Sequence, residues 1–140
     1  MESFLSTSSR AASGTGDTDA FNMRLKPALD YLAESLDNSL LQKVNSSKVG
    51  NPNQVTINNV TSNLAHLWNL FRVQDYVGHL YLLKEQKNEA LDILEIGPGY
   101  GCGAHILISL GLVKSYTCVD LCENLGKSVF FLSRNYPDWK

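Results

Sequence analysis

A short apolar segment that ends in closely spaced glycines constrains the fold of this chain more than any other feature. Residues 93–96 read Ile-Leu-Glu-Ile, and residues 97–103 contain four glycines. An apolar run that stops at such a cluster is typical of a buried parallel strand that enters a tight loop. Residues 104–110 then show a helical apolar pattern. Because glycines allow close approach and the first N–H groups of a helix lack partners, this strand–loop–helix unit predicts a ligand-binding loop.

The same alternation of strand and helix continues after the loop. Gly111 is expected to end the first helix, residues 115–119 to form a second strand that closes on Asp120, and residues 121–136 to form a final helix. A right-handed crossover makes the two strands parallel neighbours, so Asp120 should lie beside the glycine loop. Asp120 follows Gly101 by 19 residues, close to the spacing of about 20 that is typical of a ribose-binding carboxylate. Residues 91–140 therefore indicate a ribose-bearing cofactor.

The N-terminal part reads as helical. Residues 1–19 are rich in Ser, Thr, Gly and Asp, and we expect a disordered arm there. Within a helical region spanning residues 20–90, an apolar stripe predicts one helix over about 26–44. The polar residues 45–59 read as a loop, and a second helix is expected over about 61–87. Its apolar surface is wide, so other elements should cover it on more than one side.

Composition and charge exclude several classes of partner. The chain of 140 residues has a formal net charge of −2, which gives no reason to expect nucleic acid or an acidic membrane as a partner. No apolar run is long enough to span a bilayer, and the first residues lack the pattern of a signal peptide. The chain has three cysteines, an odd number that is typical of reduced thiols rather than of paired disulfides. We expect a cytoplasmic protein with a small-molecule substrate.

Histidines and cysteines give no metal signature. His66 and His79 lie in the expected second helix without a partner at metal-binding spacing, so packing or solvation is the expected role of each. His105 lies beside the glycine loop, where a contact with cofactor or substrate is an alternative to packing. Cys118 and Cys122 are expected to be small core residues rather than ligands or redox groups. No metal site is predicted.

The glycine spacing leaves the choice of cofactor open. No Gly-Lys-Ser/Thr follows the glycines, which excludes a P-loop. The dinucleotide pattern G-x-G-x-x-G fails when counted from Gly97 because position 102 is Cys, whereas counting from Gly99 meets its relaxed form at Ala104. Glu95, two positions before Gly97, suits a positively charged ligand and would repel a pyrophosphate. An NAD-dependent oxidoreductase fragment therefore remains an alternative.

Residues 94–101, Leu-Glu-Ile-Gly-Pro-Gly-Tyr-Gly, resemble the first motif of class I S-adenosylmethionine-dependent methyltransferases. Asp120 matches the acidic residue that ends the second strand of that family. The segments 93–107 and 116–125, with the aromatic helix residues 130–133, resemble the narrower family of sugar O-methyltransferases. The resemblance implies methyl transfer from S-adenosylmethionine to an oxygen nucleophile such as a sugar hydroxyl.

The resemblance also assigns roles to individual residues. Glu95 would lie near the amino group of the methionine portion, Asp120 would accept the ribose hydroxyls, and Leu121 would pack on the adenine. The backbone of the glycine loop would border the methionine and ribose portions. The cofactor-binding residues implied in this way are Glu95, Gly97, Pro98, Gly99, Tyr100, Gly101, Asp120 and Leu121.

The family's sheet has several more strands than the two expected here. The expected fold is therefore α/β, a helical N-terminal region followed by the first β-α-β-α half of a doubly wound, Rossmann-like parallel sheet that is incomplete. We expect a fragment or truncated form with little activity alone, and we assign no catalytic residue. A completing chain or a homo-oligomer is a possible partner, because an unpaired sheet edge is a liability. A non-catalytic remnant or interaction module is a further alternative.

Overall fold

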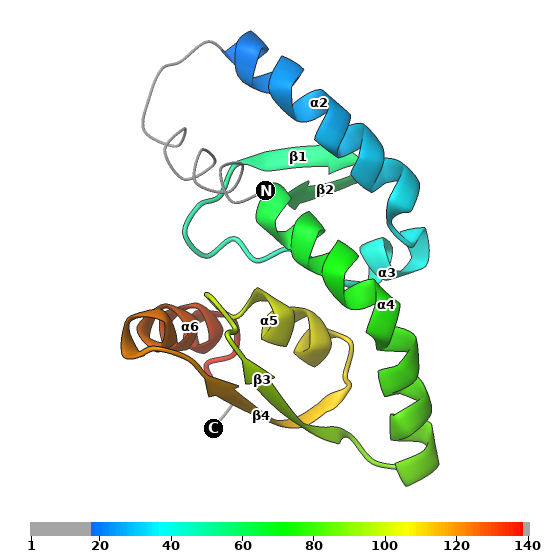
Figure 1. The fold of residues 1–140 in the computed structure, drawn as a ribbon, viewed down its shortest axis with the longest axis vertical. Helices are drawn as coiled ribbons and strands as arrows, with labels where there is room; N and C mark the ends of the chain where they lie inside the picture. The colour runs from blue at the N-terminus through cyan, green and yellow to red at the C-terminus, as the bar shows by residue number, and fades with distance from the viewer. Residues whose placement is uncertain (1–17, 139–140) are drawn as a thin grey trace.

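The computed structural model describes residues 18–138 and has a mixed α/β fold with two small sheets. Strands β1 and β2 pair in antiparallel orientation, and β3 and β4 pair in parallel (Figure 1). Most of the expected arm, residues 1–17, lies outside the described residues, while residues 18 and 19 belong to α2. In chain order the elements are α2 Thr18–Ser35, α3 Asn38–Lys43, β1 Gln54–Ile57, β2 Val60–Asn63, α4 Leu64–Lys87, β3 Leu91–Ile96, α5 Cys102–Ser109, β4 Val113–Val119 and α6 Cys122–Asn135.

The single helix expected over about 26–44 is two helices, α2 and α3, so this prediction was wrong in detail. The side chain of Asp37 accepts hydrogen bonds from the backbone N–H groups of Ser39, at 2.8 Å, and Leu40, at 3.1 Å. Asp37 is therefore the N-cap of α3. The apolar stripe continues through this break, since Leu36, Leu40 and Val44 are all buried. Apolar spacing alone did not reveal the new helix start.

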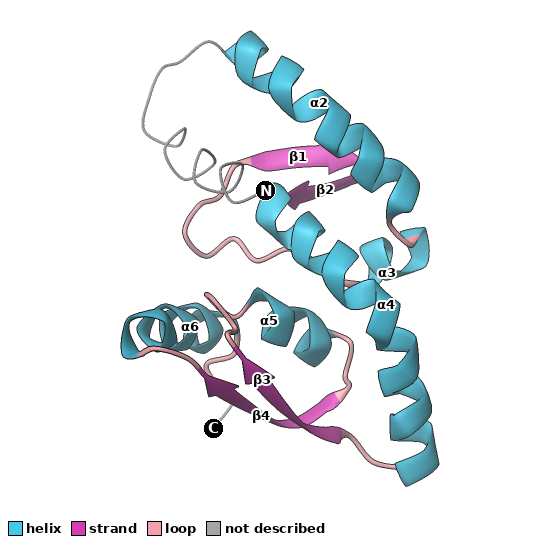
Figure 2. Cartoon of the chain, in the orientation of Figure 1, coloured by secondary structure: helices cyan, strands magenta, loops and turns pink. Residues whose placement is uncertain are grey.

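Residues 45–59 are not only a loop, and the second helix, expected over about 61–87, begins at Leu64 rather than near residue 61 and ends at Lys87 as expected. A β-hairpin, β1–β2, occupies residues 54–63. Its turn residues Asn58 and Asn59 have φ values of 48° and 64°, in the left-handed region that asparagine tolerates in hairpin turns. Asn63 ends the hairpin and caps α4, because its Oδ1 accepts the N–H of His66 at 2.7 Å. The hairpin lies beside α2, as Figure 2 shows.

Helix α4 joins the two halves of the molecule. It contacts α2, α3 and the hairpin on one side and α5 and β3 on the other. Leu67 and Leu70 in its first half are completely buried. Leu82 and Leu83 in its second half are exposed. The expectation that α4 is covered on more than one side therefore holds for its first half only.

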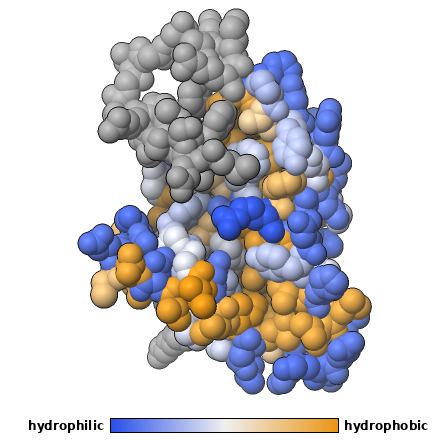
Figure 3. Space-filling model, viewed as in Figure 1, coloured by the Kyte–Doolittle hydropathy of each residue, from blue (hydrophilic) through white to orange (hydrophobic). Residues whose placement is uncertain are grey.

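The parallel pairing of the two strands after residue 90 confirms the sequence prediction. Ile96 pairs with Val119, so both strands end at the same edge of the sheet. The residues Ile93, Val113 and Tyr116 pack toward the hydrophobic core. The other face exposes Leu94 and Ile96, the latter at 79%. Figure 3 shows hydrophobic side chains gathered over the lower part of the molecule, where this sheet and the end of α4 lie.

Candidate functional site

The loop between β3 and α5, residues 97–101, is called the glycine loop here. Gly97, Gly99 and Gly101 have φ values of 73°, 59° and 93°, in the left-handed region that residues with a Cβ rarely adopt. The N–H of Gly97 donates to Val119 O at 2.8 Å, and the N–H of Gly101 donates to Pro98 O at 2.9 Å. The loop is therefore a tight turn whose first residue continues the sheet. The three glycines explain why the chain can turn this sharply at the end of β3.

Helix α6 holds the glycine loop from one side. Ser128, only 2% exposed, donates its hydroxyl to Gly99 O at 2.6 Å. A Cβ added to Gly101 would lie 3.1 Å from Leu132 Cγ, so α6 packs closely against the loop. These contacts fix the position of the loop backbone before any ligand binds.

Asp120 lies at the end of β4, next to the glycine loop. Its Oδ1 accepts the N–H of Leu121 at 2.7 Å and the Nδ2–H of Asn124 at 3.1 Å. The Asn124 side chain, then the N–H of Leu121 and, more weakly, that of Gly99 lower the pKa of Asp120 below its ordinary value. The side chain of Asp120 is therefore an ionised acceptor at neutral pH. Leu121 beside it is 74% exposed.

Glu95 belongs to β3, and its carboxylate lies between Tyr116 on β4 and the first turn of α5. Its Oε2 accepts the hydroxyl of Tyr116 at 2.9 Å. Its Oε1 would lie 3.1 Å from a Cβ built on Gly103, so the carboxylate fills the space that this glycine leaves. Burial, followed by the charge of Glu95, raises the pKa of Tyr116. A carboxylate at the start of a helix is favourably placed with respect to the helix dipole.

The predicted cofactor-binding residues share one region but differ in orientation. The glycine loop and Asp120 meet at the sheet edge, because Val119 bonds to Gly97 and Asp120 interacts with the N–H of Gly99. Glu95 lies one strand position before this edge and contacts α5. Pro98 is buried, and the ring of Tyr100 lies edge-on to Phe131 with centroids 5.0 Å apart. Pro98 and Tyr100 therefore have side chains packed against the protein, and Pro98 O already accepts the N–H of Gly101.

Several residues that shape this region were missed by sequence reasoning. Asn124 and Ser128 support Asp120 and Gly99, and Tyr116 holds Glu95. A sequence signal for two of them exists, since Asn124 and Ser128 follow Asp120 at intervals of four residues and so lie on one face of the expected helix. Tyr116 gave no such signal, because strand alternation indicates only the sheet face on which it lies.

Two of the three histidines are buried. His66 and His105 are 1% and 7% exposed, whereas His79 is exposed on α4. His105 packs against the protein through Tyr136 and Asn45, which is one of the two roles expected for it.

The cysteines differ from their expected roles in part. Cys118 is half-buried, and Cys122 is exposed, so its prediction as a core residue was wrong because it begins α6 at the surface. Cys102 is the buried thiol. Within residues 18–138, no group of three or more His, Cys, Asp or Glu side chains could hold a metal ion.

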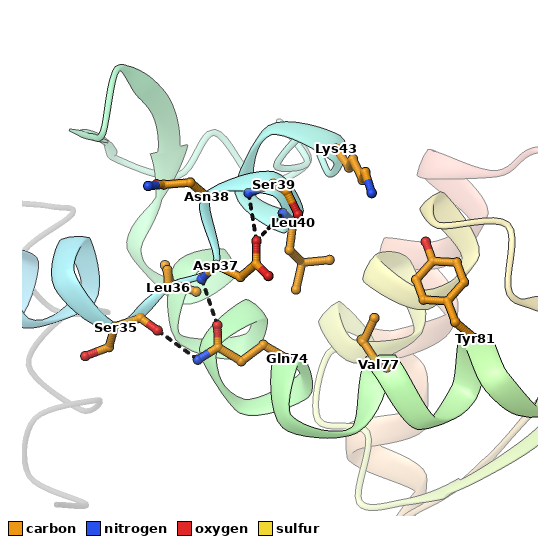
Figure 4. A pocket seen from close by; sticks show the side chains of 11 residues that line it. Ser35, Leu36, Asp37, Asn38, Ser39, Leu40, Lys43, Gln74, Val77 and Tyr81 are labelled. Atoms are coloured by element: carbon orange, nitrogen blue, oxygen red, sulfur yellow. Dashed lines mark hydrogen bonds between the residues drawn. The ribbon is translucent and has the colours of Figure 1, made fainter.

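A separate hollow of about 590 Å³ lies between the α2–α3 corner and α4 (Figure 4). Several of its polar groups already bind one another. Gln74 accepts the N–H of Asp37 at 3.0 Å and donates to Ser35 O at 3.0 Å, and the carboxylate of Asp37 caps α3. None of the predicted cofactor-binding residues lines this hollow or a second one of about 470 Å³ between α2 and the hairpin.

Comparison with protein-family models, curated proteins and solved structures gives no match for this chain. Any function assigned to the glycine loop therefore depends on its own residues and their chemistry. None of the helices within residues 18–138 combines the length and the apolar character needed to cross a membrane.

Proposed function

We propose that this chain binds S-adenosylmethionine at the glycine loop and forms the cofactor-binding part of a class I methyltransferase. In this proposal β3, α5, β4 and α6 are the first β-α-β-α half of a Rossmann-like sheet, and the methyl acceptor is an oxygen nucleophile such as a sugar hydroxyl. The observation that supports it most is the meeting of the glycine loop and the ionised Asp120 at one edge of a parallel strand pair. Ligands bind at this edge in open α/β sheets.

The residues present fit a ribose-bearing cofactor. No atom lies within 4 Å of the Cβ positions of Gly97 and Gly99, so there is open space beside the loop backbone. The carboxylate of Asp120 can accept hydrogen bonds from two neighbouring ribose hydroxyls. Leu121 is exposed beside it and offers an apolar surface to a purine ring. This combination of acceptor, apolar contact and open space beside the loop is the chemistry that the nucleoside portion of the cofactor requires.

The position of Glu95 favours a cationic ligand over a dinucleotide. A pyrophosphate would bind at the start of α5, where helix N–H groups attract phosphates. The Glu95 carboxylate already lies against that first turn, 3.1 Å from the Cβ position of Gly103. Like-charge repulsion would therefore weaken a pyrophosphate there, whereas the amino group of a methionine portion would be attracted.

When bound, S-adenosylmethionine supplies an activated methyl group on a sulfonium. The chain's own residues would hold and orient it: Asp120 through the ribose, Glu95 through the amino group and the glycine loop through its backbone. Tyr116 would act as a positioning residue, because its hydroxyl holds the carboxylate of Glu95. No general base is assigned.

Calorimetric titration of the whole chain with S-adenosylhomocysteine and, separately, with NAD tests the proposal. We expect binding of S-adenosylhomocysteine, and we expect Asp120→Ala to weaken it about tenfold or more. Glu95→Gln should also weaken S-adenosylhomocysteine, but it should spare or strengthen NAD. Glu85→Gln, the same change at an exposed position of α4, is the control and should alter neither affinity.

Three outcomes would contradict the proposal. Binding of NAD alone would favour the oxidoreductase alternative. Binding of neither ligand would favour a non-catalytic interaction module. Binding of S-adenosylhomocysteine that is unaffected by Glu95→Gln and Asp120→Ala would place the cofactor elsewhere on the molecule.

A further inference from the structure

The two carboxylate oxygens of Asp120 have different surroundings. Two hydrogen bonds reach this side chain from residues 18–138, the N–H of Leu121 at 2.7 Å and the Nδ2–H of Asn124 at 3.1 Å, and both end on Oδ1. A carboxylate oxygen has about two acceptor positions, so these two donors fill Oδ1. The N–H of Gly99 adds a weaker interaction with the carboxylate. Oδ2 is therefore the oxygen that is left for a ligand.

The two neighbours of the Asn124 amide fix its orientation. Its Oδ1 lies 3.4 Å from Lys127 Nζ, and its Nδ2 lies 3.1 Å from Asp120 Oδ1. An ammonium group only donates and a carboxylate only accepts. Rotating the amide by half a turn would place its NH2 group against Lys127 and its oxygen against Asp120, and both contacts would be unfavourable. The amide therefore donates to Asp120 and cannot accept from it.

The first turns of α6 carry Asn124 in a fixed position relative to the glycine loop. The backbone N–H groups of Asn124 and Leu125 both donate to Leu121 O, at 2.9 Å and 3.0 Å. One turn further along, Ser128 Oγ lies 2.6 Å from Gly99 O and 3.3 Å from Asn124 O. Asn124 thus belongs to a helix start that is bonded both within itself and to the loop.

We propose that Asn124 is a positioning residue that holds Oδ1 of Asp120 and so reserves Oδ2 for the hydroxyl groups of a ribose. This inference rests on the proposed function, because it takes the bound ligand to be the S-adenosyl cofactor. Two neighbouring hydroxyls of one ribose can share Oδ2, which has about two acceptor positions. Without Asn124, only the N–H of Leu121 would hold the carboxylate firmly. Since χ2 of aspartate has a broad distribution, a ligand would then have to order this side chain on binding.

A double-mutant cycle tests whether Asn124 acts through Asp120. The affinity for S-adenosylhomocysteine is measured by calorimetry for the whole chain, for Asn124→Ala, for Asp120→Ala and for the double variant. We expect Asn124→Ala to weaken binding about fivefold when Asp120 is present and to have no further effect in Asp120→Ala. A role in the folding of α6 alone would weaken binding by the same factor in both backgrounds. Alanine is favoured in helices, so the variant should fold.

A titration without ligand tests the same contact. The hydrogen bond from Asn124 is the largest cause of the lowered pKa of Asp120, followed by the N–H of Leu121, and the charge of Lys127 has a smaller effect. Asn124→Ala should therefore raise the pKa of Asp120 toward its ordinary value, as measured by the NMR shift of the carboxyl carbon. Asn69→Ala is the matched control, because Asn69 Nδ2 donates within α4 to Ala65 O at 2.8 Å. This variant should change neither the pKa of Asp120 nor the affinity.

Three results would overturn the positioning role while leaving the cofactor site in place. They are an unchanged affinity in Asn124→Ala, an equal loss of affinity with and without Asp120, and an unchanged pKa of Asp120 in the folded Asn124→Ala variant. Absence of S-adenosylhomocysteine binding by the unmodified chain is a different result. It would contradict the proposed function and, with it, the reservation of Oδ2 for a ribose.

Discussion

Replacing Gly101 with alanine should destabilise the protein at the glycine loop. Its φ of 93° lies in the left-handed region, which costs a residue with a Cβ about 1–2 kcal/mol. The added methyl group would lie 3.1 Å from Leu132 Cγ, and this crowding adds about 1 kcal/mol. Alanine also restricts the unfolded chain, which offsets about 0.5 kcal/mol. The net loss in the free energy of unfolding is about 2 kcal/mol.

Gly78→Ala is the matched control. Gly78 lies within α4, and no atom lies within 4 Å of its Cβ position. Alanine at an exposed helix position is favoured over glycine by about 1 kcal/mol, so this variant should gain stability. The same chemical change is thus expected to have opposite signs at the two positions, with a difference of about 3 kcal/mol.

Urea unfolding followed by circular dichroism measures both variants. With a slope of about 2 kcal/mol per molar urea, Gly101→Ala should lower the midpoint by about 1 M and Gly78→Ala should raise it by about 0.5 M. A Gly101→Ala midpoint equal to that of the unmodified chain would refute the left-handed turn and its close packing on α6. Equal changes of the urea midpoint in Gly101→Ala and Gly78→Ala would also refute the left-handed turn at Gly101.

Two further predictions concern single hydrogen bonds. Ser128→Ala removes the hydroxyl that α6 donates to the glycine loop, and it should cost about 1–2 kcal/mol in urea unfolding; Ser133→Ala, which removes an exposed hydroxyl bonded within its own helix, should change the free energy of unfolding by less than about 0.5 kcal/mol. Asp37→Ala removes the N-cap of α3 and should cost about 1 kcal/mol at pH 7. A hydrogen bond with the side chain of Ser39 is the largest cause of the lowered pKa of Asp37, followed by the bond from the N–H of Leu40, so the difference between this variant and the unmodified chain should shrink as the pH falls below 3.8. Equal differences at pH 7 and pH 3 would contradict this role of the Asp37 carboxylate.

The order of elements after residue 90 could be predicted because its signals are local. An apolar run, a glycine cluster and a helical stripe follow one another without interruption in residues 91–110. The hairpin could not be predicted in the same way, since its strands are only four residues each and its turn contains Asn58 and Asn59 rather than glycine. The break between α2 and α3 was missed because Asp37 starts a helix without disturbing the apolar spacing.

In the candidate site, too, the features with local sequence signals could be predicted and the others could not. The glycines and Asp120 were predicted from local spacing, and they meet at one edge of the sheet. The groups that hold them in place come from distant positions: Ser128 is 29 residues from Gly99, and Tyr116 is 21 residues from Glu95. The four-residue spacing from Asp120 places Ser128 on one face of a helix, but it does not say that this face packs on Gly99. That packing and the contact of Tyr116 with Glu95 depend on residues far apart in the sequence.

The exposed apolar face of the β3–β4 pair is the least ordinary feature of the fold. Leu94, Ile96 and Val119 are exposed there, although parallel sheets are ordinarily covered on both faces. Within residues 18–138 this face has no covering layer of helices. The exposure predicts that the face contributes little to the stability of residues 18–138.

Mapping the binding of S-adenosylhomocysteine by amide chemical shifts is the most direct test of the cofactor site. The largest shifts should fall on Gly97, the residues 99–101, Asp120 and Leu121, with smaller ones at Glu95. Shifts concentrated on the hollow beside Asp37 and Gln74, or an absence of shifts at millimolar ligand, would contradict a cofactor site at the end of the parallel strands.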